Sequence, residues 1–370
     1  MTTLTPLPSW PDLLAGLAGG RPAGDALAAP WLGGGARAFR FSRSAWALHA
    51  IAAWWRQTHS DAAPRLWLPD YFCNQSTEPL SRTGASLRHY PVADDLEPDW
   101  PACRAMLADG PAPDLFVLTH YFGHAADGAR AAAFCGEAGA LLIEDAAHAL
   151  APGNGIGDSG DFVLYSPHKL LAVPEVALLV ARGADHAAAV ASAVATLPPG
   201  RSAAGAKWLA TRAVLKLLPG FALARRYRAL PGFDYDPPYG TLATTPFAGA
   251  VAERLLARQS ADLADVAARR RSNAESWRRY FQAKPDCGVP LFTAGAEGAA
   301  PYRFVQRFAD AAAAEKWFGR FRARGVPVET WPDLAPEVLA DPARHGRALE
   351  LRRRLVLFPV HQTLTFPRNL

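Results

Sequence analysis

Residues 141–181 read LLIEDAAHALAPGNGIGDSGDFVLYSPHKLLAVPEVALLVA, and this stretch decides the fold. It contains two short apolar runs, Leu141–Ile143 and Phe162–Tyr165, each of which is followed by polar residues. Their length and their boundaries are typical of buried strands. In an open parallel sheet, the groups at the carboxyl ends of the strands line the ligand crevice. We therefore expect a carboxylate, an imidazole, a hydroxyl and an amine to converge on one site.

The acid and the lysine at these two strand ends suggest a definite chemistry. Pyridoxal phosphate needs an amine to which its aldehyde can bond, and a carboxylate that keeps its pyridine nitrogen protonated. Asp145 is the candidate carboxylate and Lys169 the candidate amine. Burial beside a cationic ring would favour the neutral, reactive form of the amine. An ion pair that only closes the sheet is the alternative for these two residues alone.

The surrounding pattern extends the match. An E-D-A-x-H strand end at 144–148 is followed by Gly160-Asp161-Phe162, and then by Ser166 and Lys169. This pattern resembles the DegT-type sugar aminotransferases, a branch of the fold-type-I pyridoxal-phosphate enzymes, over roughly residues 38–365. The resemblance implies that Asp145 pairs with the pyridine nitrogen and that His148 lies beside the ring. It also implies that Ser166 binds the cofactor phosphate and that Lys169 is the catalytic base.

The segment after the lysine departs from that pattern. The family has a glycine-rich E-G-G or D-G-G turn, whereas this chain reads Pro174-Glu175-Val176-Ala177. Glycine adopts positive φ at little cost, but a β-branched residue such as Val176 does not. We therefore predict that residues 174–177 contain no left-handed residue. Glu175 is expected to turn toward the site or toward a partner subunit.

A second candidate element lies at residues 41–57. Phe41-Ser42-Arg43-Ser44-Ala45 precedes the amphipathic run WALHAIAAWWRQ, which predicts a helix capped by Ser42 or Ser44. Free amide groups at a helix start suit a phosphate. The resemblance assigns the same role to this turn, so Arg43 and Ser44 are candidate cofactor-binding residues. An ordinary capped helix is the alternative.

Aromatic and histidine residues supply the remaining candidates. Leu68–Phe72 resembles a family segment whose aromatic ring stacks on the pyridine ring, so Tyr71 and Phe72 are candidates; a core position is the alternative for either ring. His120 and His124 have a spacing that could serve a metal on a helix. Because the residues before them read as a strand and Gly123 as a turn, no metal site is predicted.

Length and patterning set the architecture. At 370 residues and 50% apolar content, the chain is long enough for two domains. From Arg65 onward, short strand and helix patterns alternate, which predicts an α/β fold with a mostly parallel, doubly wound sheet. We predict an N-terminal lead-in at 1–38, a large pyridoxal-phosphate-binding domain at 39–240 and a smaller α+β domain at 241–370. A continuous helical pattern from about Ala248 to Phe281 enters the smaller domain.

Other features concern the compartment and the partners. The four cysteines have neither C-x-x-C spacing nor a paired framework, which favours a reducing cytosol. No apolar run reaches the ~18 residues of a membrane span. Residues 201–228 are basic and apolar, and no acidic residue occurs between Asp185 and Asp234. Such a stretch can lie on an anionic membrane, grip nucleic acid, bind a phosphorylated substrate, or simply pack on the large domain. No nucleic-acid-binding motif accompanies it.

The sequence therefore leads to a functional hypothesis. By resemblance, a cytoplasmic homodimer transfers an amino group from an amino acid such as glutamate to a keto sugar. The sugar is expected to be nucleotide-linked, in polysaccharide or secondary-metabolite biosynthesis. One alternative is a pyridoxal-phosphate enzyme without net amino transfer, for example a dehydratase-like one. The other is a catalytically reduced relative that acts as a binding partner through the basic 201–228 segment.

Overall fold

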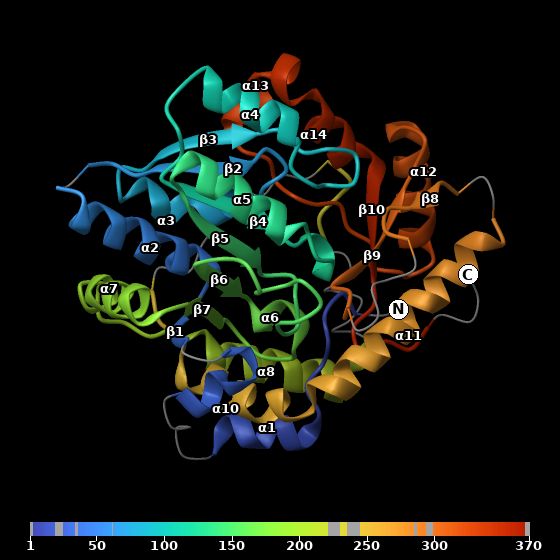
Figure 1. Ribbon diagram of the computed structural model, residues 1–370. Coiled ribbons are helices and arrows are strands. Elements are labelled where there is room, and N and C mark those ends of the chain that lie inside the picture. Colours follow the sequence, from blue (N-terminus) through green and yellow to red (C-terminus); the bar gives the residue numbers. More distant parts are fainter. Residues whose placement is uncertain are drawn as a thin grey trace.

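The computed structural model describes residues 3–18, 25–33, 36–60, 62–220, 230–234, 245–284, 287–293 and 299–366. Two sheets organise these residues, one of seven strands and one of three (Figure 1).

The large sheet has the strand order β1-β7-β6-β5-β4-β2-β3. The strands β2 to β6 all run parallel to one another. The strand β7 runs antiparallel to its two neighbours, β6 and β1. The prediction of a mostly parallel sheet is thus confirmed. The strand β1 was not expected from the sequence. The bounds are β1 Arg37–Phe41, β2 Arg65–Pro69, β3 Ser86–Tyr90, β4 Leu115–Thr119, β5 Leu141–Ala146, β6 Phe162–Tyr165 and β7 Ala177–Ala181.

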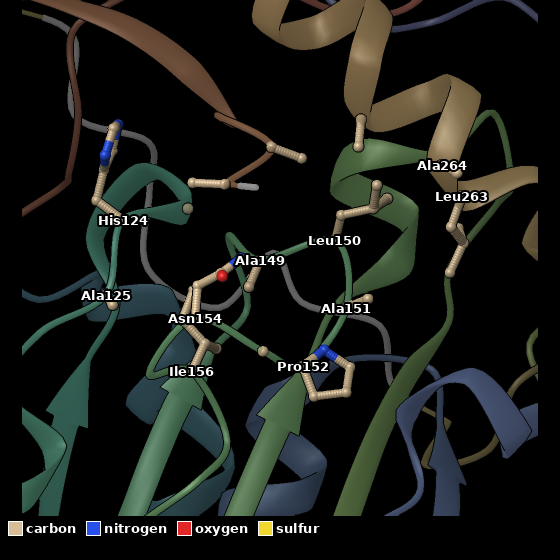
Figure 2. A pocket seen from close by; sticks show the side chains of 15 residues that line it. His124, Ala125, Ala149, Leu150, Ala151, Pro152, Asn154, Ile156, Leu263 and Ala264 are labelled. Carbon is tan, nitrogen blue, oxygen red and sulfur yellow. The ribbon is translucent and has the colours of Figure 1, made fainter. Parts of the chain in front are cut away.

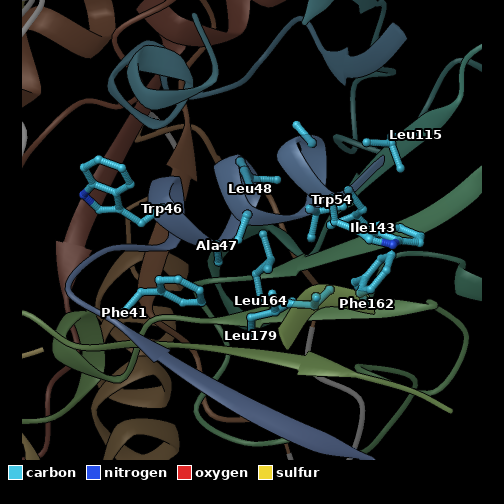
Figure 3. Close-up of a cluster of buried hydrophobic side chains, with 14 of the residues drawn as sticks. Phe41, Trp46, Ala47, Leu48, Trp54, Leu115, Ile143, Phe162, Leu164 and Leu179 are labelled. Atoms are coloured by element: carbon cyan, nitrogen blue, oxygen red, sulfur yellow. The ribbon is translucent and has the colours of Figure 1, made fainter. Parts of the chain in front are cut away.

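Helices cover one face of this sheet at its centre. Alternate strand residues such as Leu115, Ile143 and Leu164 point to this face and pack beneath the apolar side of α2 (Figure 3). The two-residue alternation of a strand sends the intervening residues to the opposite face. The helices of this first layer are α2 (Ser44–Thr58), α3 (Glu78–Ser81) and α7 (Ala184–Ala195).

A second layer covers the other face, so the sheet is doubly wound. The helices α4 (Trp100–Ala108) and α5 (Gly128–Ala138) pack over β2, β4 and β5. Over β6, β7 and β1 lie α1 (Trp10–Leu17), η1 (Asp25–Trp31), α8 (Ala204–Leu217) and α10 (Ala250–Gln259). The described part of the N-terminal lead-in is therefore packed: Asp12 pairs with Arg258 at 2.7 Å.

The small sheet is antiparallel and consists of β8 (Val289–Pro290), β9 (Arg303–Arg307) and β10 (Leu355–Pro359). The helices α11 (Leu263–Gln282) and α12 (Ala311–Ala323) cover it with a cluster of aromatic rings centred on Trp277. The apolar run VPVETW at 326–331, whose composition is typical of a strand, forms only a single bridge between Glu329 and Leu357. Pro327 has no N–H to donate, so a regular ladder cannot form through it.

Two connections differ from the sequence patterns. The continuous helix expected from Ala248 is two helices, α10 and α11, separated by the 3-10 turn η4 (Ser260–Asp262). Asp262 begins α11, because its side chain accepts a hydrogen bond from the N–H of Asp265. The helices α13 (Pro336–Ala340) and α14 (Pro342–Arg354) pack back on the core of the large sheet. The division of the chain at residue 240 stays a prediction.

The basic 201–228 stretch is described only in part. Its first half forms α8, which packs on α1 and α10, and residues 221–229 lie outside the described residues. Within the described ranges, no helix combines the length and the apolar character needed to cross a bilayer. The partner of this stretch stays a prediction.

Candidate active site

Asp145 and Lys169 meet in a pocket beyond the carboxyl ends of two adjacent strands. Asp145 lies near the end of β5, and β6 leads into the short helix α6 (Pro167–Leu170), which carries Lys169. The two strands are parallel neighbours, so their ends lie at the same edge of the sheet. The lining residues are Ser44, Phe72, Cys73, Ser76, Thr119, Asp145, Ala147, His148, Lys169 and Trp331. The structure thus brings together five of the eight predicted site residues.

The hydrogen bonds of His148 indicate the protonation state of the lysine. His148 Nδ1 accepts from the N–H of Phe122 at 3.3 Å, and His148 Nε2 lies 3.3 Å from Lys169 Nζ. Burial and the neighbouring Lys169 place the pKa of His148 well below its usual value, so the ring is neutral. A neutral ring that accepts at Nδ1 carries its proton on Nε2. We therefore assign Nε2–H as the donor that faces the lysine amine, which accepts this hydrogen bond in its unprotonated form.

Aromatic rings fix the orientation of this imidazole. The ring of His148 is parallel to those of Phe122 and Tyr302, with centroid distances of 5.5 and 4.5 Å. Trp331 lies edge-on at 4.9 Å. Phe122 has a φ of 56°, an uncommon conformation for a residue with a side chain, and it is this backbone that directs its N–H to His148. Because the ring cannot rotate, the proton it offers to Lys169 is fixed in direction.

Burial shifts the pKa of both charged partners toward the neutral form. Burial lowers the pKa of Lys169, and the carboxylate of Asp145 acts against that shift. Burial raises the pKa of Asp145, and Lys169 acts against that shift in turn. Asp145 Oδ1 also accepts from the N–H of Ala147 at 3.0 Å. A buried amine of lowered pKa beside a carboxylate of raised pKa is suited to covalent chemistry and to binding a cation.

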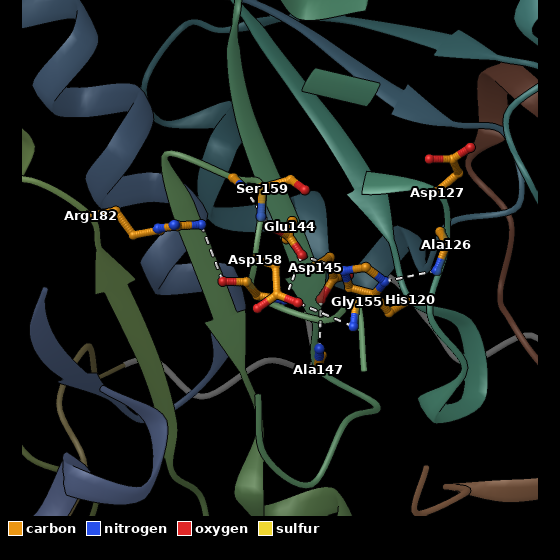
Figure 4. A network of polar contacts seen from close by, with 12 residues as sticks. His120, Ala126, Asp127, Glu144, Asp145, Ala147, Gly155, Asp158, Ser159 and Arg182 are labelled. Carbon is orange, nitrogen blue, oxygen red and sulfur yellow. Dashed lines mark hydrogen bonds and ion pairs between the residues drawn. The ribbon is translucent and has the colours of Figure 1, made fainter. Parts of the chain in front are cut away.

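The neighbouring acid, Glu144, points away from the pocket (Figure 4). Its Oε2 lies 2.7 Å from His120 Nε2, and its two oxygens accept three backbone N–H groups from residues 157–160. His120 Nδ1 in turn accepts from the N–H of Ala126. His124 stacks on Phe292 instead of approaching His120. Within the described ranges, no cluster of three potential metal ligands occurs.

The start of α2 lies at the wall of the same pocket, which Ser44 lines. Arg43 is the N-cap residue, and no side chain caps the helix. The prediction that Ser42 or Ser44 is the cap is therefore wrong: Ser42 Oγ donates to the carbonyl of Thr245, and Ser44 is the first helical residue, on the pocket wall. An uncapped helix start suits an anion. Within the described part of the chain, the fully buried Ser166 Oγ has no hydrogen-bond partner.

These features fit pyridoxal phosphate. The set consists of an amine, a carboxylate, an uncapped helix start with Ser44 and Ser76 beside it, and an orphaned serine hydroxyl three residues before the lysine. Only about 10 Å³ of free volume remains among these side chains. Occupancy by a ring and a phosphate would therefore require Lys169 and its neighbours to move apart.

Two predicted site residues lie elsewhere. Tyr71 is fully buried in the core, where its hydroxyl donates to the carbonyl of Trp331 at 2.5 Å, so Phe72 is the ring of this pair that faces the pocket. Arg43 points away from the pocket and contacts His168 and Glu175. Arg43 Nη2 donates to the carboxylate of Glu175, and a charge-assisted contact of this kind is strong enough to fix the direction of the side chain.

Sequence reasoning missed four lining residues. Thr119 ends β4 and could have been found by the same strand-end argument that selected Asp145. Cys73 directly follows the aromatic pair that comes after β2, and Ser76 lies in the 3-10 turn η2 (Asn74–Thr77). Trp331 comes from the loop before α13, and no local pattern marks it.

A larger cavity lies beside this pocket (Figure 2). It has a volume of about 230 Å³ and is formed by the loops after β4 and β5, by residues 299–300 and by the start of α11. Figure 2 shows mostly small and apolar side chains around it, together with Asn154 and His124. His124 is its one titratable residue among the described lining, and burial lowers the pKa of that imidazole to about 4. The cavity therefore offers shape and little charge.

The arrangement of the two sheets and their helices is similar to that of solved aminotransferases of fold type I, which confirms the predicted α/β fold class. PseC of Helicobacter pylori, an aminotransferase involved in pseudoaminic acid biosynthesis, matches with a TM-score of 0.72 at 13% identity, over 99% of this chain and 95% of its own. A DegT/DnrJ/EryC1/StrS aminotransferase from Brucella abortus matches with a TM-score of 0.65 at 16% identity, over 96% and 92%. Spr1654 from Streptococcus pneumoniae, solved in PLP and PMP forms, gives 0.66 at 12% in its PLP form, over 98% and 94%. No protein-family model and no curated protein matches the chain.

Proposed function

We propose that this protein is a pyridoxal-phosphate-dependent aminotransferase that moves an amino group from an amino acid such as glutamate to a keto sugar. The observation that carries the proposal is the buried amine of Lys169, 3.3 Å from a histidine of fixed orientation and in one pocket with Asp145. The likeness of fold to sugar aminotransferases supports the choice of acceptor. A nucleotide-linked sugar and a role in polysaccharide or secondary-metabolite biosynthesis complete the proposal.

Each residue has a proposed task. Bound pyridoxal phosphate would supply an electron-withdrawing ring that stabilises negative charge on the substrate. Asp145 would hold the proton on the ring nitrogen, and Phe72 would flank the ring. Ser44, Ser166 and the N–H groups at the start of α2 would bind the phosphate.

Proton movement is assigned to the lysine. Nζ of Lys169 takes the proton from the alpha carbon of the amino donor, because a neutral amine in a buried site is a competent base. His148 donates from Nε2 to that amine and so keeps its lone pair oriented. Since the pKa of His148 lies well below its usual value, this donor stays neutral across the physiological pH range.

The direct test begins with the purified chain. Pyridoxal phosphate is added, the visible spectrum is recorded, and borohydride is then used to fix the cofactor to the protein for mass spectrometry. We expect a visible absorption band and one modified residue, Lys169. Glutamate should then bleach the band and yield one equivalent of 2-oxoglutarate. A chain that gains no band and no modification at Lys169 is not an enzyme of this class. A band that glutamate and other amino acids leave unchanged would favour chemistry without amino transfer.

The assembly and the compartment stay predictions. In the related family the cofactor lies near the subunit boundary, and on that ground we propose a homodimer. Light scattering on the cofactor-loaded protein tests this proposal. A stable monomer that retains both cofactor and activity would refute it. The four cysteines have no disulfide partner in the structure, in keeping with the proposed cytoplasmic location.

A further inference from the structure

The segment that carries Lys169 is held without glycine. Residues 168–176 contain no glycine, and the positions where the related family has two glycines are Val176 and Ala177. Neither has a positive φ, which confirms the prediction of ordinary backbone geometry there. The segment therefore lacks the tight left-handed turn that glycine permits. Other contacts must fix the position of the lysine.

Contacts from the far end of the chain hold the backbone of this segment. The side-chain amide of Gln259 pairs with both the N–H and the C=O of Ala172, at 2.8 and 3.1 Å. Arg270 Nη2 and Gln362 Nε2 both donate to the carbonyl of Leu170, at 2.6 and 3.1 Å. Leu170 and Ala172, which follow Lys169 by one and three residues, are thus held by side chains from α10, from α11 and from the segment after β10.

A chain of side-chain contacts joins the two ends of the same segment. His168 Nδ1 lies 2.7 Å from the carbonyl of Val176, which requires the imidazole proton to be on Nδ1. His168 Nε2 then accepts from Arg43 Nη1 at 2.9 Å. Arg43 Nη2 donates to Glu175 Oε1 at 2.7 Å, and Ser202 Oγ donates to Glu175 Oε2 at 2.8 Å. The start of α2 is thereby connected to residues on both sides of Lys169.

We propose that Arg43, His168 and Glu175 are positioning residues that replace the glycine turn, holding Lys169 in place and balancing the charge near its amine. The inference rests on the proposed function, since it assigns these residues to the attachment of pyridoxal phosphate at Lys169. None of the three lines the pocket that contains the lysine amine. They act through the segment and through their charges.

The charge balance has identifiable members. The amine of Lys169 faces the carboxylate of Asp145 and the thiol of Cys73, which favour its protonation, and the cations Arg43 and Arg303, which oppose it. His148 and His168 are the further titratable neighbours among the described residues, and burial lowers the pKa of both imidazoles well below its usual value, so both are neutral. Glu175 compensates the charge of Arg43 through their 2.7 Å ion pair. Arg43, His168 and Glu175 also line a second pocket. Lys207 and Arg212 contribute to the same pocket.

Two substitutions change this balance in opposite directions. Arg43→Gln removes a cation and leaves Glu175 uncompensated, so the pKa of Lys169 should rise. Glu175→Gln leaves Arg43 uncompensated, so the pKa of Lys169 should fall. The two shifts should have opposite signs, because one substitution removes a cation and the other removes the anion that compensates it. A purely structural role would weaken cofactor attachment in both variants and would move the pH dependence of both in the same direction.

The experiment follows the rate at which cofactor-free protein takes up pyridoxal phosphate, by visible absorbance, from pH 6 to pH 10. Borohydride reduction and mass spectrometry confirm the attachment at Lys169. The pH midpoint of the rate is expected to move up in Arg43→Gln and down in Glu175→Gln. Arg43→Lys keeps the charge and loses the two-pronged contact. It should slow uptake while its midpoint stays near that of the wild type.

Asp114→Asn is the matched control. It breaks a similar ion pair, Arg65–Asp114 at 2.6 Å, at the opposite end of the strands, and should leave the midpoint unchanged. Equal or parallel midpoints in Arg43→Gln and Glu175→Gln would overturn the inference, even if both variants bind the cofactor weakly. Wild-type protein that attaches pyridoxal phosphate at Lys169 and transfers no amino group would overturn only the proposed function. Absence of any attachment at Lys169 would overturn both.

Discussion

Two consecutive acids of one strand, Glu144 and Asp145, have opposite surroundings. Glu144 is fully buried, and its two oxygens accept from three backbone N–H groups and from His120. Asp145 faces the other side of the sheet, where among the described residues it accepts one backbone hydrogen bond and shares its pocket with the amine of Lys169. Each acid has a histidine nearby, yet only the first has its hydrogen-bonding capacity filled.

The difference separates structure from function. A buried carboxylate with every acceptor position used stabilises the fold and has nothing left to offer a ligand. A carboxylate left short of partners costs stability, and such a cost is typical of sites that bind a cation or react. The loop 157–160 supplies the backbone N–H groups that surround Glu144. Its close approach to the strand requires glycine, because a Cβ at Gly160 would lie 2.8 Å from the carbonyl oxygen of Phe162.

The largest effect is expected at the amine on the functional side of this comparison. Lys169→Ala should lower amino-transfer activity by at least about a thousandfold, because it removes both the attachment point and the base. Initial rates with glutamate and a keto acceptor measure the loss. Lys216→Ala, in α8 and outside the pocket of Lys169, is the control and should keep its activity. Residual activity within tenfold of the wild type would show that another group is the base.

The acid of the functional side comes next. Asp145→Asn should lower activity by about a hundredfold, because the neutral amide cannot hold the proton on the ring nitrogen. The cofactor-free protein should lose no stability, since the substitution removes a desolvated charge. Activity assays and thermal unfolding on the same preparation test both statements. Loss of stability with retained activity would reverse the roles of the two acids.

The structural acid should show the converse behaviour. Glu144→Gln places an amide NH₂ against backbone N–H donors, so the free energy of unfolding should fall by about 2 kcal/mol. Activity per folded molecule should stay within a few-fold of the wild type at a temperature below the transition. Urea unfolding of the cofactor-free protein provides the measurement. A variant as stable as the wild type would mean that the loop 157–160 contributes little to the fold.

The smallest expected effect is on the pH dependence of stability, which should have opposite signs for Glu144 and Asp145. Burial would raise the pKa of Glu144, but His120 and the backbone N–H groups outweigh it and lower that pKa, so its stabilisation is present above about pH 4.5 and lost in acid. The pKa of Asp145 is raised by burial, so its ionised form costs stability above about pH 4. Relative to the wild type, Glu144→Gln should be less stable and Asp145→Asn more stable at pH 7, by about 1 kcal/mol or more for each. Both differences should shrink toward zero in acid. Differences of the same sign at pH 7 would contradict the comparison.

The sequence was informative where the chemistry is local. The apolar runs before Asp145 and Ser166 predicted the strands, and parallel strand ends predicted that the acid and the lysine would meet. The absence of glycine at Val176 and Ala177 predicted their backbone geometry. In each case a short segment contains the whole physical argument.

Long-range competition between groups was not visible in the sequence. Arg43 forms an ion pair with Glu175, 132 residues away, and Ser42 donates to the carbonyl of Thr245, 203 residues away. Neither residue therefore has the role that its local motif suggests. The same holds for Tyr71, whose hydroxyl is bound by the carbonyl of Trp331. The sequence shows which groups can bind, while the fold decides which partner reaches each group first.

The contact between Gln362 and Leu170 has a consequence for the order in which the protein is made. The carbonyl next to Lys169 receives this donor from a residue synthesised 192 positions later, and His361 beside it binds the carbonyl of Thr3 at 2.8 Å. A ribosome therefore releases the sheet and the lysine long before it releases the residues that fasten them. A nascent chain that stops short of residue 361 carries all the proposed catalytic groups. It lacks the hydrogen bonds that join His361 to Thr3 and Gln362 to Leu170. The reactive amine is secured only after residue 362 has been synthesised and has left the ribosome.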